Sequence, residues 1–143
     1  MQINQATREH HPILIDIWEA SVRATHHFLT NEDILYFRQR IPEQYFNLVD
    51  LYYISNEQQE ITGLLGLSPG KIEMLFIHPR HFRKGYGNLL TGYAIRQHQV
   101  NQVDVNEQNP QAVAFYLRQG FRIINRLEKD NEGKDFPILQ MEL

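Results

Sequence analysis

Three short apolar segments, at residues 51–55, 61–68 and 71–77, constrain the fold of this 143-residue chain more than any other feature. Each has the length and composition of a β-strand. The polar turn 56–60 separates the first two, and Pro69-Gly70 separates the second from the third. Because consecutive strands joined by tight turns pair with one another, we expect a three-stranded antiparallel meander at the centre of the chain.

Helices and further strands flank this meander. The clearest helix runs from Pro110 to about Gln119, because Asn109 is a favourable N-cap and Gly120 a favourable C-terminal cap. Apolar spacing and capping residues predict three more helices, which begin near residues 7, 30 and 88, the second ending near residue 42. Four more strands are expected at residues 2–6, 103–106, 121–128 and 137–142. The expected fold is therefore α/β (α+β), with about seven strands and about four helices in one domain, residues 1–143.

The composition excludes several classes of protein. With no cysteine, the chain has no disulfide, no thiolate zinc site and no cysteine nucleophile. A net charge of -3 argues against nonspecific nucleic-acid binding. No apolar run reaches the roughly 18 residues of a membrane helix, and the N-terminus lacks a signal-peptide core, so we expect a cytoplasmic protein without a membrane partner.

Histidines and serines do not form recognisable catalytic or metal-binding patterns. The adjacent pairs His10-His11 and His26-His27 cannot face one metal ion from a helix, and no HExxH motif exists. Ser21 and Ser68 lack the strand-turn-helix elbow of a serine hydrolase. We expect no metal site.

A glycine-containing loop, Arg83-Lys84-Gly85-Tyr86-Gly87-Asn88, lies directly between a predicted strand and a predicted helix. In this position, backbone N–H groups and the helix dipole converge on an anion, and glycines allow a ligand to approach the main chain. The spacing is neither that of a Walker loop nor that of a dinucleotide fingerprint. Taken alone, the loop also fits an ordinary strand-to-helix turn.

Three strings in order along the chain carry a family resemblance: LFIHP at 75–79, GYG at 85–87 and VNEQNPQAVAFYLRQGF at 105–121. Together they resemble the GNAT family of N-acetyltransferases, and in particular its small bacterial single-domain members. Residues 21–29 also resemble the segment on the substrate side in that subgroup. The resemblance implies a GNAT-type fold with a mixed, mostly antiparallel central sheet.

The resemblance also implies acetyl-CoA as the acetyl donor. Strand backbone at 75–77 would pair with the pantetheine arm, amides between Phe82 and Asn88 would bind the pyrophosphate, and Asn109 would lie near the thioester. The implied cofactor contacts are Leu75, Phe76, Ile77, Phe82, Arg83, Lys84, Gly85, Tyr86, Gly87, Asn88, Asn109 and Phe115. Phe82 stands where the family has Gln or Arg, so we expect amides rather than side chains to hold the pyrophosphate.

Tyr116 is the candidate proton donor. Asn109, Ala112 and Tyr116 are spaced to share one helix face. The phenol, with a usual pKa of about 10, could donate to the departing CoA thiolate, which resembles a cysteine with a pKa of about 8.5. The alternative is that Phe115 and Tyr116 are core aromatics.

A proton acceptor is also required, because freeing an amine with a pKa of about 10.4 at pH 7 costs roughly 4.6 kcal/mol. Glu73, Asp104 and His26 are candidates, each acting through water. The sequence does not choose between them.

The leading hypothesis is direct acetyl transfer from acetyl-CoA to a primary amine, on a small molecule or a peptide, within a ternary complex. A non-catalytic acyl-CoA sensor with the same fold is the second hypothesis, and an unrelated α/β nucleotide-binding protein is the third. The acceptor stays open, as does the choice between monomer and homodimer.

Overall fold

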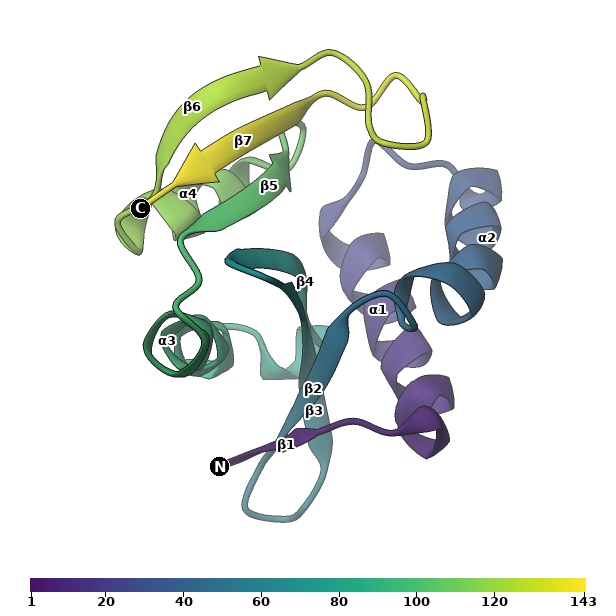
Figure 1. Ribbon diagram of the computed structural model, residues 1–143. Coiled ribbons are helices and arrows are strands. Elements are labelled where there is room, and N and C mark those ends of the chain that lie inside the picture. The colour runs from purple at the N-terminus through teal and green to yellow at the C-terminus, as the bar shows by residue number, and fades with distance from the viewer.

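The structure, a computed structural model, describes residues 1–143 and is organised around one seven-stranded sheet (Figure 1). The strands lie in the order β1-β2-β3-β4-β5-β7-β6, and every neighbouring pair is antiparallel except β4 and β5. Their bounds are β1 (Gln2–Gln5), β2 (Asp50–Ser55), β3 (Ile61–Ser68), β4 (Lys71–Ile77), β5 (Gln102–Asn106), β6 (Arg122–Leu127) and β7 (Ile138–Glu142). The predicted meander corresponds to β2, β3 and β4, and the predicted fold class is confirmed.

Four α-helices cover the sheet, with α1 and α2 on one side and α3 and α4 on the other (Figure 1). They are α1 (His11–Thr25), α2 (Asn31–Arg40), α3 (Tyr86–His98) and α4 (Pro110–Arg118). The two layers have separate hydrophobic clusters. In β3, Leu64 packs into the cluster beneath α1 and α2, whereas its neighbour Leu65 packs into the cluster beneath α3 and α4. This alternation is what the two faces of a strand require.

Local signals set the helix ends. The Thr30 hydroxyl accepts a hydrogen bond from the Asp33 amide at 3.1 Å, and the Asp33 carboxylate accepts one from the Thr30 amide at 3.0 Å, so the predicted capping box is present. The Asn109 side chain accepts a bond from the Ala112 amide at 3.3 Å. The helix expected to end near Pro42 ends at Arg40 and continues as a π-helical turn, Ile41–Tyr45.

One predicted helix start was wrong. Thr7 begins a single 3-10 turn, Arg8–His10, and α1 starts only at His11. Pro12 accounts for the break, because it has no N–H to donate to the carbonyl of Arg8, so a regular helical ladder cannot pass this point.

The sheet divides between β4 and β5. These parallel strands pair only at Lys71 with Gln102 and at Ile72 with Val103, whereas β3 follows β4 as far as Ile77. The edge of β4 beyond Ile72 therefore has no strand partner on the β5 side. None of the helices combines the length and apolar character required to cross a bilayer.

Candidate active site

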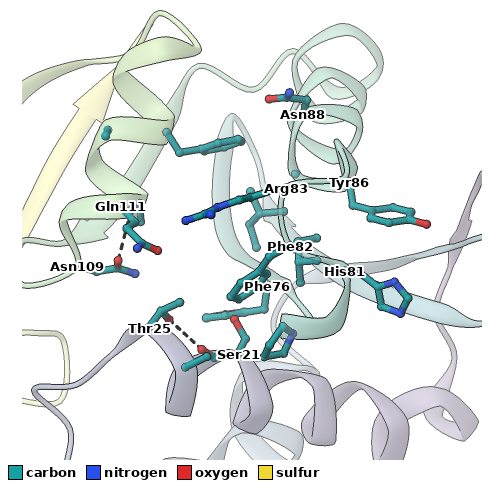
Figure 2. A pocket seen from close by; sticks show the side chains of 18 of the residues that line it. Ser21, Thr25, Phe76, His81, Phe82, Arg83, Tyr86, Asn88, Asn109 and Gln111 are labelled. Carbon is teal, nitrogen blue, oxygen red and sulfur yellow. Dashed lines mark hydrogen bonds between the residues drawn. The ribbon is translucent and has the colours of Figure 1, made fainter.

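A groove of about 860 Å³ opens where β4 and β5 diverge. Its walls come from α1, β4, the loop before α3, and α4 (Figure 2). A smaller cavity of about 140 Å³ lies within the gap between β4 and β5. The two spaces share the residues His26, Leu75, Phe76, Asn109, Ala112 and Tyr116. These shared residues mark the point where a ligand in the groove would meet a ligand in the cavity.

The loop before α3 leaves a continuous run of amides free. None of the N–H groups from Arg83 to Asn88 donates a hydrogen bond within the protein, and the first helical bond runs from the Leu89 amide to the Gly85 carbonyl. Gly85 has a φ of +90°, a left-handed conformation that favours glycine. The free amides and the N-terminus of α3 together present positive partial charge to the groove, a geometry that suits an anion.

Arg83 adds a positive charge to this site. It also has a positive φ, +61°, and its side chain extends from the loop toward α4 (Figure 2). It makes no ion pair, and no carboxylate lines the groove. The groove is therefore suited to a ligand with negative charge at this end.

The other predicted cofactor residues divide into two groups. Phe82, Asn88, Asn109 and Phe115 line the groove, as do residues 75–77 and both loop glycines. Lys84 is exposed and is not among the lining residues, so only its amide remains available to a ligand. Tyr86 touches the groove, but its ring is 5% exposed and points away from the cavity, into the core (Figure 2).

Gly87 holds the α3 wall close to α4. A Cβ at this position would lie 3.3 Å from two carbons of the Phe115 ring. The glycine thus permits a contact between the walls, in addition to any approach by a ligand.

Tyr116 lies at the junction of the groove and the smaller cavity. Its ring is 6% exposed and packs edge-on against Phe115 and Phe121, with centroids 5.1 and 5.6 Å away. The hydroxyl forms no hydrogen bond within the protein. Burial raises the pKa of Tyr116 above its usual value, so the phenol stays protonated at neutral pH.

His26 faces both spaces from the end of α1 and is 8% exposed. Burial, with the neighbouring His27, lowers its pKa from 6.5 to about 4, so the ring is neutral at pH 7. The Thr25 hydroxyl donates to the Ser21 carbonyl at 2.8 Å and lies 2.7 Å from His26 Nδ1. Because that hydroxyl has a single proton, Nδ1 must be the donor in the second contact. The Nε2 lone pair is then free to accept a proton.

Glu73 and Asp104 line only the smaller cavity. Lys71 lies 2.8 Å from the Asp104 carboxylate and 3.7 Å from that of Glu73. The Ser68 hydroxyl donates to Glu73 at 2.9 Å. Both carboxylates are therefore partly engaged, and they give the cavity a negative character that the groove lacks.

Sequence reasoning missed several residues of the groove wall. Gln111 and Arg118 line it from α4. Ser21 and Thr25, which were predicted only as part of the substrate-side segment 21–29, line it from α1. Helical spacing contained both signals, since Gln111, Phe115 and Arg118 recur on one stripe of α4, and Ser21 and Thr25 are four residues apart.

Comparison with known proteins identifies the class. The family model described as an acetyltransferase (GNAT) domain matches residues 14–143. The chain therefore belongs to the GNAT family of acetyltransferases, which confirms the resemblance found in the sequence.

The chain is also similar to individual acetyltransferases. The chain is 33% identical over 144 residues to the peptidyl-lysine N-acetyltransferase YjaB of Salmonella typhimurium strain LT2, covering 99% of this chain and 97% of YjaB. The solution structure of apo-form YjaB from Escherichia coli superimposes with a TM-score of 0.90 at 33% identity, covering 99% of this chain and 95% of that one. The PaiA N-acetyltransferase of Thermoplasma acidophilum, solved with coenzyme A, shares the fold, with a TM-score of 0.76 at 17% identity over 99% and 98% of the two chains. Because the chain belongs to this family and matches peptidyl-lysine N-acetyltransferases over nearly its whole length, it is an N-acetyltransferase.

Proposed function

We propose that this chain, acting as one domain, transfers the acetyl group of acetyl-CoA to the side-chain amine of a lysine in a peptide or protein. The observation that carries the proposal is the run of free amides from Arg83 to Asn88, beside a groove that Tyr116 also lines. Acetyl-CoA would supply an activated thioester. The lysine acceptor is inferred from the peptidyl-lysine activity named for the YjaB relative.

The groove fits the parts of acetyl-CoA in order. The free amides and Arg83 suit the pyrophosphate, by charge and by hydrogen bonding. The unpaired β4 edge at residues 75–77 offers backbone donors and acceptors to the amides of the pantetheine arm, as a neighbouring strand would receive them. The thioester then falls beside Asn109 and Tyr116.

The charge of the smaller cavity supports a cationic acceptor. Glu73 and Asp104 line this cavity, and no carboxylate lines the groove. An alkyl ammonium is therefore attracted to the cavity side and an anionic cofactor to the groove side. The two substrates would approach the shared residues from different directions, as direct transfer in a ternary complex requires.

In the proposed reaction, the amine nitrogen bonds to the acetyl carbon and the carbon–sulfur bond breaks. Tyr116 donates a hydrogen bond to the departing thiolate. Since burial raises its pKa further above the roughly 8.5 of a thiol, full proton transfer is unfavourable. We assign Tyr116 stabilisation of the developing charge, an effect that preorganised donors provide strongly.

His26 is the proposed proton acceptor. Its Nε2 lone pair is free, whereas the Glu73 carboxylate is engaged by Ser68 and lies near Lys71. A histidine with a pKa of about 4 does not deprotonate a ground-state ammonium. The ammonium therefore loses its first proton to bulk water, at a cost of roughly 4.6 kcal/mol at pH 7. The free amine then attacks, and His26 accepts the second proton from the more acidic nitrogen of the adduct. The departing thiolate takes up a proton from solvent. Glu73 and Asp104 then serve to attract the acceptor.

A two-part experiment tests the proposal. Acetyl-CoA should raise the melting temperature, because a ligand that binds only the folded state stabilises it. A lysine-containing peptide with acetyl-CoA should then release free thiol and gain an acetyl group, detected by mass spectrometry. Stabilisation without acetylation of any amine in a broad screen would favour an acyl-CoA sensor. Stabilisation by nucleoside triphosphates alone would favour a nucleotide-binding protein.

A further inference from the structure

A row of four aromatic rings leads away from the junction of the groove and the smaller cavity. The Phe76 and His26 ring centroids are 6.3 Å apart, those of His26 and Phe28 are 5.3 Å apart, and those of Phe28 and Phe136 are 5.4 Å apart. Phe76 belongs to β4, His26 and Phe28 to the segment between α1 and α2, and Phe136 to the loop between β6 and β7. Because Phe76 and His26 line both spaces, the row begins where the reaction would occur.

Core packing does not account for the outer two rings. Phe28 and Phe136 are half-buried, yet neither belongs to or packs against either hydrophobic cluster. Leu29, the residue after Phe28, does pack against the cluster beneath α1 and α2. Other half-buried aromatic side chains, such as Phe37, Phe115 and Tyr93, also pack against a cluster; Phe82, which lines the groove, does not. Phe28 and Phe136 thus pack within the aromatic row rather than into either cluster, and each stays partly exposed.

Phe136 is held in position by its own loop. The Glu132 carboxylate, 13% exposed, accepts hydrogen bonds from the Tyr45 hydroxyl, from the Tyr36 hydroxyl at 3.2 Å and from Arg40 Nε at 3.4 Å. These bonds attach the β6–β7 loop to α2 and to the turn that follows it, and Figure 1 shows the loop reaching over to this side of the molecule. A ring fixed in this way presents a preformed surface to a ligand.

We propose that Phe28 and Phe136 form an acceptor subsite, which receives the alkyl chain of a lysine and directs its ammonium group along the aromatic row toward His26 and Tyr116. This inference rests on the function proposed above and assigns residues that determine acceptor specificity. Methylene groups pack on aromatic faces, and an ammonium within about 6 Å of a ring centroid is attracted by it. The row carries no positive charge at neutral pH, because the His26 ring is neutral there.

The subsite favours one kind of acceptor. The row ends at a surface loop, so the peptide backbone of a substrate can stay outside while its lysine side chain reaches inward. A short amine such as methylamine spans too little of the row to use Phe28 and Phe136. We therefore expect a lysine peptide to have a much lower KM than methylamine, and we expect this preference to depend on the two rings.

The test replaces each ring by leucine, which keeps apolar bulk but removes the aromatic face. Phe28→Leu and Phe136→Leu should each raise the KM for a lysine peptide by roughly 5-fold, a value within the range of cation–π energies. The KM for acetyl-CoA should not change, and the preference for the lysine peptide over methylamine, measured as the ratio of their kcat/KM values, should fall by about the same factor. Tyr93→Leu, a matched change on α3 outside the groove, should leave both KM values unchanged.

A binding measurement separates this inference from the proposed function. The affinity of the lysine peptide for the protein saturated with coenzyme A, measured by calorimetry, should fall by the same factor in both leucine variants. If the wild type acetylates the peptide but the variants bind it as tightly as the wild type does, the subsite is wrong and the function stands. If the wild type neither binds nor acetylates the peptide, both the subsite and the proposed function are wrong. Two independent variants keep the test decisive should one not fold.

Discussion

The two sides of the gap between β4 and β5 are built in different ways. Most of the groove wall comes from the second half of the chain, with β4, the loop and the start of α3 in residues 71–88, and α4 at Pro110–Arg118. The end of α1 completes the wall. The acceptor side joins segments far apart in sequence, since Tyr36 and Glu132 are separated by 96 residues. A cofactor that is the same in every family member can be held by local backbone. A variable acceptor is better matched by loops that change independently.

The two sides also differ in the chemical groups that they offer to a ligand. The groove offers main-chain N–H groups and Arg83, whereas the other side offers aromatic rings and the carboxylates of Glu73 and Asp104. Substitutions on each side should therefore affect different kinetic constants. Residues at the junction should affect turnover itself.

The largest expected effect is at the junction. Tyr116→Phe should lower kcat by about 10²–10³-fold, the usual consequence of removing a preorganised donor to a developing negative charge. The KM for acetyl-CoA and the melting temperature should be nearly unchanged, because the hydroxyl has no partner within the protein to lose. Steady-state kinetics on a verified acceptor would check this.

Tyr52→Phe is the matched control for that variant. Tyr52 is also buried, at 9% exposure, but does not line the groove, so its phenylalanine variant should keep full turnover. Full activity in Tyr116→Phe would remove the donor role and leave Tyr116 as a core aromatic.

The second prediction concerns stability at the same junction. Above pH 6.5, His26 is neutral in both the folded and the unfolded states. Below it, the unfolded state binds a proton that the folded state does not bind until about pH 4. The free energy of unfolding should therefore fall as pH decreases through this window, by roughly 3 kcal/mol in total from this residue.

Urea unfolding at several pH values, in the wild type and in His26→Gln, measures this contribution as the difference between two slopes. His27→Gln should reduce the pH dependence by less than His26→Gln does, because the neighbouring His27 is the smaller of the two causes that lower the His26 pKa. Equal slopes in the wild type and in His26→Gln would mean that His26 is not held neutral by burial, and would weaken its role as proton acceptor.

Alanine variants of two glycines, one on each side, test the two sides separately. Gly85 and Gly133 both have positive φ, +90° and +77°, and an added Cβ would meet nothing within 4 Å at either. Each change to alanine should therefore lower stability through backbone strain alone, by about 1 kcal/mol. Only Gly85→Ala distorts the anion site, so only it should raise the KM for acetyl-CoA, by roughly 5-fold. An equal rise in Gly133→Ala would contradict this division.

The smallest effect is expected on the acceptor side. Glu132→Gln replaces an acceptor of three hydrogen bonds by an amide, which loosens the β6–β7 loop. The KM for a lysine peptide should rise about 3-fold, since a weakened hydrogen bond costs roughly 0.6 kcal/mol. The KM for acetyl-CoA should stay constant. Glu107→Gln, which breaks an exposed pair with Arg126, is the control and should change neither. A rise in the KM for acetyl-CoA alone would mean that Glu132 supports cofactor binding and not acceptor binding, which would contradict the assignment.

The same difference in construction explains how much the sequence could predict. Caps such as Asn109 and the Thr30 box act over three residues, so the helices they start were predicted correctly. The loop glycines pointed to an anion site for a similarly local reason. The 3-10 turn after Thr7 was missed because it depends on the N–H that Pro12 lacks, five residues away.

The acceptor side could not be predicted in this way. Nothing in the residues around Phe28 indicates that Phe136 will lie against it, because their contact depends on the complete sheet and on the Glu132 bonds. Likewise, the free lone pair of His26 follows from where the Thr25 hydroxyl donates, a detail only the folded chain determines.

Amide hydrogen exchange with each ligand tests the account most directly. Coenzyme A should slow exchange within residues 83–88, where the free amides acquire acceptors. A lysine peptide added to the coenzyme A complex should then slow exchange in residues 26–29 and 130–136, with little further change in the loop. If coenzyme A leaves residues 83–88 unprotected, or if the peptide protects the loop rather than the aromatic row, the assignment of the two sides is contradicted.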